Sequence, residues 1–156
     1  MQTEISAPLA DAWDFYFDDR RWPTWVDGFA SVTAALGYPD VGGTLQWRST
    51  PAGRGVVSER VLEHEARRRH RIEFSDAYAS GEQTTGFEIA RASGEAARTR
   101  VTLELLYRLA DGGLLGPITD PIFVRPQMRR SLTRTLERLR GELSEEQPSA
   151  SGVPLA

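Results

Sequence analysis

The chain has 156 residues, of which 40% are hydrophobic and 26% are charged, a balance typical of a globular domain with a buried core. With 19 basic and 22 acidic residues its formal net charge is −3, which gives no support to a nucleic-acid or membrane partner. The absence of cysteine excludes disulfides, thiolate nucleophiles and cysteine zinc sites, and no apolar run approaches the roughly 20 residues of a membrane span.

The N-terminal region predicts a strand followed by two short helices. Residues 1–13 show no basic region followed by an apolar core, so we expect no secretory signal and a cytoplasmic protein. Residues 3–6 (TEIS) form a candidate strand, and the aromatic stretch 20–29 (RRWPTWVDGF) holds the second short helix. Leu9, Trp13 and Phe17 recur at four-residue spacing, which predicts the first helix.

From residue 29 onward the period of the apolar residues changes to two, which predicts about six antiparallel strands. The candidate strands are 29–36, 44–50, 56–65, 70–78, 82–92 and 98–110. In the last of them every second residue is apolar or aromatic, namely Val101, Leu103, Leu105, Tyr107 and Leu109. Such one-sided alternation is typical of an antiparallel sheet with one buried face.

A long helix is predicted near the C-terminus, with one apolar face made by Met128, Leu132, Leu136, Leu139 and Leu143. It is long enough to cover the sheet, and a strongly twisted sheet curls around such a helix. Either Pro121 and Pro126 lift or interrupt its front half, or Pro117 and Pro121 lie in a loop before a helix that begins near Ile122. We expect one domain over residues 1–145 and a disordered tail over residues 146–156.

Two stretches of the chain carry a resemblance to a known family, 5–29 (ISAPLADAWDFYFDDRRWPTWVDGF) and 134–143 (RTLERLRGEL). Together with the order of elements, they resemble the START / Bet v 1-like (SRPBCC) superfamily, especially its polyketide cyclase/dehydrase-like branch. The resemblance implies an α+β helix-grip fold, in which a curved antiparallel sheet of about six to seven strands wraps on a long C-terminal helix. It also implies two short helices after the first strand, and a ligand cavity beneath the front of the last helix.

Strand alternation predicts which side chains face that cavity. If Ile72 and Phe74 point inward, Asp76 and Tyr78 share their face. The resemblance adds Trp25, since the family places an aromatic residue near the cavity mouth. We expect ligand contacts from Trp25, Trp47, Phe74, Thr85, Phe87, Leu105, Ile122 and Met128. If the protein is an enzyme, the polar groups that would act on a substrate are Asp76, Tyr78 and Tyr107.

The two histidines, His64 and His70, flank Arg67 symmetrically, so a hairpin that turns there would bring their imidazoles face to face. Such a pair could bind a metal ion, with Glu63 or Glu65 nearby. The surrounding arginines repel a cation, however, so we favour an exposed hairpin without a metal, and we expect no cofactor.

Other motifs give little support to a further activity. The sequence contains no G-x-S-x-G, G-x-G-x-x-G or Walker motif. An arginine series on the last helix could bind an anionic lipid or RNA, but we favour a solvated helix flank for Arg129, Arg130, Arg134 and Arg138.

We therefore expect a protein, monomer or homodimer, that binds a hydrophobic small molecule such as a lipid or polyketide, without nucleic acid and without membrane insertion. One alternative is a polyketide cyclase or aromatase that catalyses aldol cyclisation and dehydration in the cavity. Placing both histidines on an exposed hairpin leaves no convincing acid–base pair, which weakens that alternative. A second alternative is a protein-interaction module with a closed core and no ligand.

Overall fold

The computed structural model describes residues 1–51, 53–90, 97–109 and 121–145, and the side chains of all of these except 121–125 and 145. The chain begins with strand β1 (Gln2–Ile5), helix α1 (Leu9–Phe17), the 3-10 turn η1 (Asp19–Arg21) and helix α2 (Trp22–Trp25). It continues with β2 (Phe29–Leu36), β3 (Thr44–Ser49), β4 (Val56–Glu65), β5 (Arg69–Ser75), β6 (Ala79–Ala90), β7 (Arg98–Leu109) and helix α3 (Pro121–Glu145).

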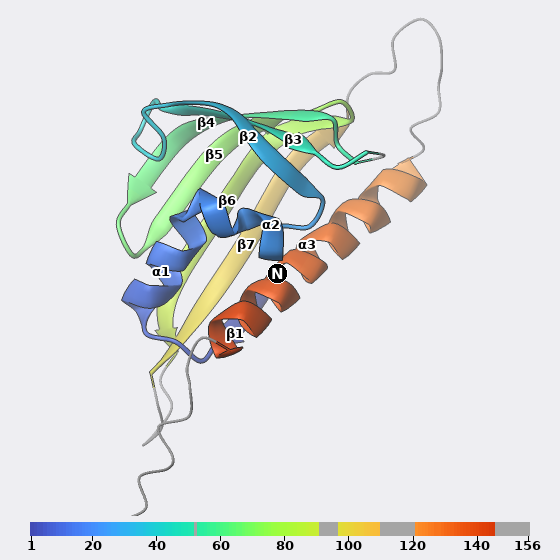
Figure 1. Ribbon diagram of the computed structural model, residues 1–156. Helices are drawn as coiled ribbons and strands as arrows, with labels where there is room; N and C mark the ends of the chain where they lie inside the picture. The colour runs from blue at the N-terminus through green and yellow to red at the C-terminus, as the bar shows by residue number, and fades with distance from the viewer. Residues whose placement is uncertain (52, 91–96, 110–120, 146–156) are drawn as a thin grey trace, which may run out of the picture.

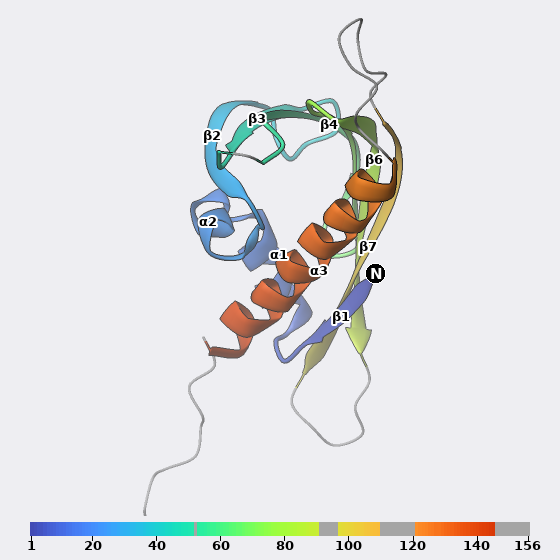
Figure 2. The same ribbon diagram turned by 90° about the vertical axis from the view of Figure 1, so that its right-hand side faces the viewer.

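These strands form a seven-stranded antiparallel sheet in the order β1-β7-β6-β5-β4-β3-β2. The sheet curves around α3, and α1 and α2 lie on the same concave side (Figures 1 and 2). This is the helix-grip arrangement that the sequence predicts, with two short helices after the first strand and a long helix at the end. The concave face therefore holds the interior of the protein.

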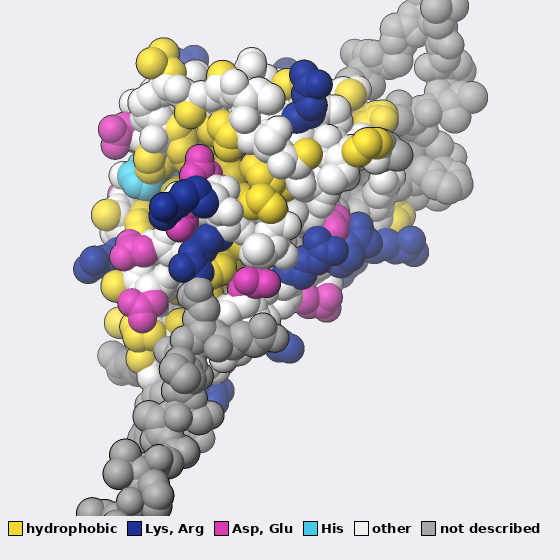
Figure 3. All heavy atoms as spheres, viewed as in Figure 1, with side chains coloured by type: hydrophobic (Ala, Val, Ile, Leu, Met, Phe, Trp, Pro, Cys, Tyr) yellow, Lys and Arg dark blue, Asp and Glu magenta, His cyan; other side chains and the backbone are white. Residues whose placement is uncertain are grey.

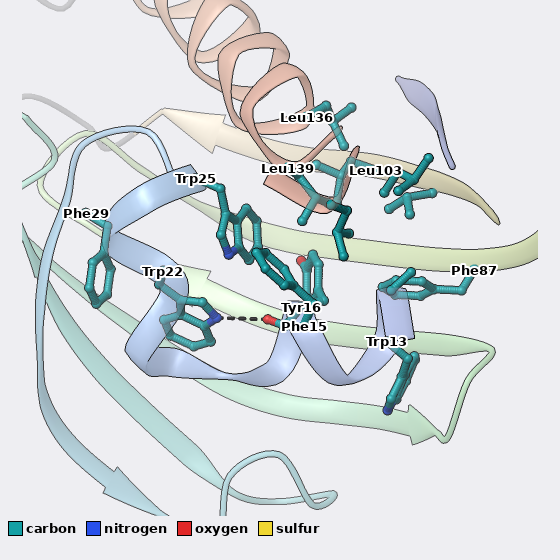
Figure 4. Close-up of a cluster of buried hydrophobic side chains, with 14 of the residues drawn as sticks. Trp13, Phe15, Tyr16, Trp22, Trp25, Phe29, Phe87, Leu103, Leu136 and Leu139 are labelled. Atoms are coloured by element: carbon teal, nitrogen blue, oxygen red, sulfur yellow. Dashed lines mark hydrogen bonds between the residues drawn. The ribbon is translucent and has the colours of Figure 1, made fainter. Parts of the chain in front are cut away.

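The main core joins the back half of α3 to α1, α2 and the sheet. Leu136, Leu139 and Leu143 are buried there, as the predicted apolar face of the helix requires. Aromatic side chains from α1 and α2 fill the space below them (Figure 4). A second, smaller cluster of buried residues lies further along the sheet and consists of Val61, Ile72, Phe74 and Ala79.

Helix α3 begins at Pro121 and continues through Pro126 to Glu145. The expectation that Pro126 interrupts the helix is therefore wrong; the start agrees with the alternative of a helix beginning near Ile122, although Pro121 is helical and does not lie in the preceding loop. Pro121 stands at the first helical position, where its fixed φ is favourable and its missing N–H has no intrahelical partner to lose. Residues 110–120 and 146–156, with Pro117 and the expected tail, lie outside the described residues.

Strand β4 carries one extra residue, which changes the direction of its last side chains. Val61 lies opposite Ile72, but the next paired residue is Glu63, opposite Arg71, so Leu62 is bulged out of the ladder. After the bulge His64 lies opposite His70. The expected hairpin is confirmed, with Arg67 in a left-handed turn conformation (φ 60°) between the two strands.

Candidate functional site

A cavity of about 90 Å³ lies between the concave face of the sheet and helices α2 and α3. Its apolar wall consists largely of aromatic rings from α1, α2, the sheet and the connection after β2, and includes Tyr16, Trp22, Trp25, Phe29, Tyr38 and Trp47. Polar side chains also line it, notably Arg54, Glu59, His70 and Gln83. The arrangement is an aromatic chamber with a few polar groups, which is the usual character of a small-molecule site.

Glu59 is one of two described acidic residues that line this chamber, the other being Asp27. The indole Nε1–H of Trp47 donates a hydrogen bond of 2.7 Å to the Oε1 atom of Glu59. Burial raises the pKa of Glu59 above its usual value, although the hydrogen bond from Trp47 and the charge of Arg54 both act in the opposite direction. A carboxyl group with a raised pKa can give or take a proton near neutral pH.

His70 lies deeper, on the inner face of β5, and is only 3% exposed. Its Nε2 atom is 3.5 Å from the hydroxyl oxygen of Tyr38, and its Nδ1 atom is 3.0 Å from Nδ1 of His64. Burial lowers the pKa of His70 to about 4, with a smaller contribution from His64. Burial also raises the pKa of Tyr38 well above 10, so both side chains are neutral at pH 7.

Two other polar groups on the inner face are the hydroxyl of Tyr16, which is hydrogen-bonded, and the indole N–H of Trp25, which is not hydrogen-bonded to any described residue. Tyr16 and Thr85 share a hydrogen bond of 3.0 Å between their hydroxyl groups. Burial raises the pKa of Tyr16 to about 12. Trp25 is 2% exposed, and its buried Nε1–H finds no hydrogen-bond partner among the described residues. Figure 4 shows Trp25 below α3, beside Tyr16.

Arg54 connects the cavity to the loop between β5 and β6. Its guanidinium lies 5.7 Å from the ring centre of Trp47 and 5.2 Å from that of Phe74, within the range of cation–π attraction. Its Nε–H also donates to the carboxylate of Asp76. Asp76 in turn accepts the backbone N–H groups of Tyr78 and Ala79, so it fixes the turn and holds Arg54 against the aromatic wall.

Helices α2 and α3 close the cavity on the side away from the sheet, and polar contacts of Asp27 join them beside the apolar core. The backbone N–H of Asp27, just after α2, donates to the hydroxyl of Thr135 over 3.0 Å. The carboxylate of Asp27 accepts two hydrogen bonds from Arg134, at 3.0 and 2.8 Å, and Arg138 lies 3.4 Å away. The basic side chains of α3 form a row on the surface (Figure 3), and two of the four predicted arginines thus bind Asp27.

The expected ligand contacts divide between the cavity and the cores beside it. Trp25 and Trp47 line the cavity. Thr85 is not among the lining residues but is hydrogen-bonded to Tyr16, which lines the cavity, whereas Phe87 packs in the main core. The side chain of Ile122 lies outside the described set. The second cluster, next to the cavity, contains Phe74, Leu105 and Met128.

The three polar groups expected to act on a substrate do not meet in the structure. Tyr78 is 44% exposed, and Tyr107 is half-buried against the second cluster. Asp76 lies in the turn after β5, because that strand ends at Ser75 and not, as predicted, at Tyr78. The alternation that would have carried Asp76 and Tyr78 inward therefore stops before it reaches them.

The expectation that both histidines lie on an exposed hairpin is wrong. His70 is buried, and His64 is half-buried because the bulge at Leu62 turns it inward. Glu59 was missed by the sequence analysis although it had a visible signal. It shares a strand face with the buried Val57 and Val61, just as His70 shares one with Ile72 and Phe74.

A larger hollow of about 1050 Å³ crosses the outer face of the sheet. Its lining includes outward-facing side chains such as Leu36, Arg60, Glu73 and Leu106, and both leucines are more than 70% exposed. Buried polar groups converge on the inner cavity instead, which is why we place the candidate site there. Within the described part of the chain no cluster of three or more potential metal ligands occurs, and no helix is long and apolar enough to cross a membrane.

Comparison with known proteins agrees with this geometry. Among solved structures the chain is similar to Zhui aromatase/cyclase from Streptomyces sp. R1128, with a TM-score of 0.70 and 16% identity over 98% of this chain and 96% of that chain. It is also similar to a conserved protein from Geobacillus kaustophilus (TM-score 0.66, 10% identity, 93% of each chain). A third similar structure is a protein from Thermus thermophilus (TM-score 0.65, 17% identity, 95% of this chain and 97% of that chain).

At these identities the structural likeness establishes the fold, and the sequence itself establishes the family. A search among curated proteins found no match. The family model described as polyketide cyclase / dehydrase and lipid transport matches residues 1–144. That range spans every strand and nearly all of α3, including each residue that lines the cavity. The chain therefore belongs to the polyketide cyclase/dehydrase and lipid transport family.

Proposed function

We propose that the protein binds a flat hydrophobic molecule that carries oxygen acceptors, of the aromatic polyketide type, in the cavity between the sheet and α3. The observation that carries this proposal is the unpartnered N–H of Trp25 in the wall of the cavity. A buried donor without a partner costs about 1–3 kcal/mol, which a carbonyl or phenol oxygen of a ligand would recover. The aromatic walls offer the ligand rings stacking and edge contacts.

A ligand of this class requires the cavity to widen. The volume of about 90 Å³ is well below the ~300 Å³ at the lower end for drug-sized ligands. The boundary between α2 and α3 is where widening would meet the least resistance. Hydrogen bonds of Asp27 to Thr135 and Arg134 hold it, and such partly exposed polar contacts exchange readily with water.

A pair of matched ligands tests the proposed contact with Trp25. Fluorenone and fluorene are planar tricycles that differ by one carbonyl oxygen, and isothermal titration calorimetry can compare their affinities for the full-length protein. We expect Trp25→Phe to weaken fluorenone binding about fivefold, the loss of one hydrogen bond of about 1 kcal/mol, and to leave fluorene unchanged. If neither ligand binds the wild type, or if the substitution weakens both equally, the proposal is wrong.

Trp22 supplies the control for this experiment. Its Nε1–H already donates to the backbone carbonyl of Tyr16 over 2.8 Å, so it has no donor to offer a ligand. Trp22→Phe should therefore change protein stability without discriminating between fluorenone and fluorene. Thermal unfolding of each variant would separate a change in stability from a change in recognition.

Catalysis is a second candidate function, favoured by the convergence of Tyr38, Glu59 and His70 on the cavity. In an aldol cyclisation His70 would take the proton beside one ligand carbonyl, while Tyr38 would donate to that carbonyl oxygen. The resulting carbon nucleophile would attack a second carbonyl, and the new alkoxide would take the proton held by His70. His70 would then take a second α-proton while the carboxyl group of Glu59, whose pKa burial raises, protonates the departing hydroxyl, so that water leaves and transfer of the proton from His70 to Glu59 restores both groups.

Proton exchange at an activated ketone would test the first of these steps. The C1 protons of 2-tetralone exchange with D₂O, and ¹H NMR measures the rate with and without protein. We expect the wild type to accelerate exchange, and His70→Gln to reduce that acceleration about 100-fold, the contribution typical of a general base. No acceleration by the wild type would contradict the catalytic function while leaving the binding proposal intact.

A further inference from the structure

The two histidines share a single hydrogen bond inside the protein. His64 and His70 lie opposite each other on β4 and β5, and their Nδ1 atoms are 3.0 Å apart with the rings at 87°. A ring nitrogen either carries a hydrogen or presents a lone pair. For the hydrogen bond to exist, one Nδ1 must therefore donate while the other accepts, and the pair shares one proton.

The two ends of this pair face different surroundings. His70 is buried and lines the cavity, with its Nε2 atom directed at the hydroxyl of Tyr38. His64 is half-buried, and its Nε2 atom has no hydrogen-bond partner within the described part of the chain. Histidine atoms are also visible on the protein surface (Figure 3). The pair thus extends from the cavity towards solvent.

Aromatic side chains of α1 cover the pair on its inner side. The ring of Phe17 lies 5.2 Å from that of His64 and 4.9 Å from that of His70, edge-on to both. Trp13 lies 5.3 Å from His64. These rings limit the access of water to the Nδ1 atoms, so a proton that leaves the cavity by this route has to pass through the imidazoles themselves.

We infer that His64 and His70 form a proton relay between the cavity and solvent, in which His70 faces the ligand and His64 is the positioning and relay residue. This inference rests on the catalytic form of the proposed function. In the starting state Nδ1–H of His70 donates to His64, and Nε2 of His70 presents a lone pair to the cavity. When that nitrogen accepts a ligand proton, the Nδ1 proton moves to His64, and Nε2 of His64 releases its proton to water.

The relay moves one proton without leaving charge on either histidine; the negative charge stays on the deprotonated ligand. Both imidazoles end neutral, each in its other tautomer, and the shared hydrogen bond now points from His64 to His70. The reverse sequence returns a proton to the cavity, as the final protonation of a cyclised product requires. Burial lowers the pKa of both histidines and so disfavours a cation on either; Asp40 partly offsets this at His64, whereas His64 adds to it at His70.

Two kinds of substitution test the relay. His64→Gly removes the outer imidazole and leaves a gap that free imidazole can enter. Glu63→Gln is the matched control, since Glu63 is adjacent in sequence but is directed to the outer face, where it pairs with Arg71. The full-length protein with ¹⁵N-labelled histidine is used throughout.

The shared proton is measured by ¹⁵N NMR of the ligand-free protein. We expect one protonated and one unprotonated Nδ1, with a scalar coupling across the hydrogen bond that His64→Gly abolishes and Glu63→Gln retains. If both Nδ1 atoms lack a proton, or no coupling is present, the relay is wrong whatever the protein does with a ligand.

Exchange of the C1 protons of 2-tetralone measures the transfer. We expect His64→Gly to slow the catalysed exchange about tenfold and millimolar imidazole to restore it, a rescue that a purely structural role would not give. Unchanged exchange in His64→Gly, or a loss that imidazole does not restore, would overturn the relay. Absence of exchange in the wild type would overturn the catalytic function, and with it the transfer to a ligand, but not the shared proton.

Discussion

Trp47 and Glu59 are diagonal neighbours on β3 and β4, and the indole N–H of one reaches the carboxylate of the other over 2.7 Å. Leu45 lies opposite Glu59 and Val57 lies opposite Trp47, so the pair is set among buried apolar side chains. Trp47 thus gives the carboxylate of Glu59 a hydrogen-bond donor but no positive charge. The acid is consequently held where its ionised form is disfavoured.

Replacing that acid should make the protein more stable at high pH. Since the pKa of Glu59 is raised in the folded protein, its contribution to stability is fully present below the unfolded value of 4.5 and is lost as pH rises through the folded pKa. Glu59→Gln keeps an oxygen for Trp47 and removes the charge. In urea titrations the free energy of unfolding of the variant should rise relative to that of the wild type between pH 5 and pH 8. A wild type more stable than the variant at pH 8 would contradict the raised pKa of Glu59.

His70 should give the opposite pH dependence. Its pKa is about 4 when folded and 6.5 when unfolded, so the unfolded chain takes up the proton first as pH falls. We expect the free energy of unfolding to decrease by up to about 3 kcal/mol between pH 7 and pH 4, and His70→Gln to remove most of that decrease. His64 contributes in the same direction and Glu59 in the opposite one, so the difference between wild type and variant is the quantity to measure.

The polar contacts of Asp27 should limit the rate at which ligands reach the cavity. Asp27→Asn weakens the ion pairs to Arg134 and Arg138, and we expect association of a fluorescent apolar probe to become several-fold faster in stopped-flow measurements. Added salt should raise the association rate of the wild type towards that of the variant, because screening weakens exposed ion pairs. Glu4→Gln, which cuts a comparable pair to Arg100 at β1 and β7, should leave association unchanged.

The packing of α3 against the sheet should depend on the buried leucines of the helix. Leu139 is fully buried, so Leu139→Ala should lower the free energy of unfolding by about 2–5 kcal/mol in urea titrations. Leu106 is 75% exposed on the outer face, and Leu106→Ala should change stability by less than about 0.5 kcal/mol. Similar effects of the two substitutions would show that α3 does not carry the core.

The fold followed from the sequence because its signals were strong and repeated. Alternation in β7 and the spacing of four and three residues between Leu132, Leu136 and Leu139 each mark one buried face, and short antiparallel connections leave few topologies. The end of β5 was harder to locate. Asp76 binds backbone N–H groups in a turn, and that local bond ended a strand that the apolar pattern would have extended.

The site was predicted less well, because it depends on contacts between segments distant in sequence. Tyr38 lies in the connection after β2, and no periodicity indicates that its hydroxyl lies near His70, 32 residues later. Glu59 and His70 could have been found by extending the alternation of their own strands. Charged and titratable residues on a buried face are uncommon, which is what made them easy to assign to solvent.

The single additional residue in β4 decides which chemistry the interior receives from that strand. Were Leu62 paired with Arg71 in an unbroken ladder, Glu63 would lie opposite His70, and its carboxylate would occupy the inward direction now taken by the imidazole of His64. In homologues whose β4 has no such extra residue, the inward position after Val61 would be reached one residue earlier than in this chain. Alignments that compare interiors across the family should accordingly be anchored on the β4–β5 turn, since counting from the start of the strand would pair side chains of opposite faces.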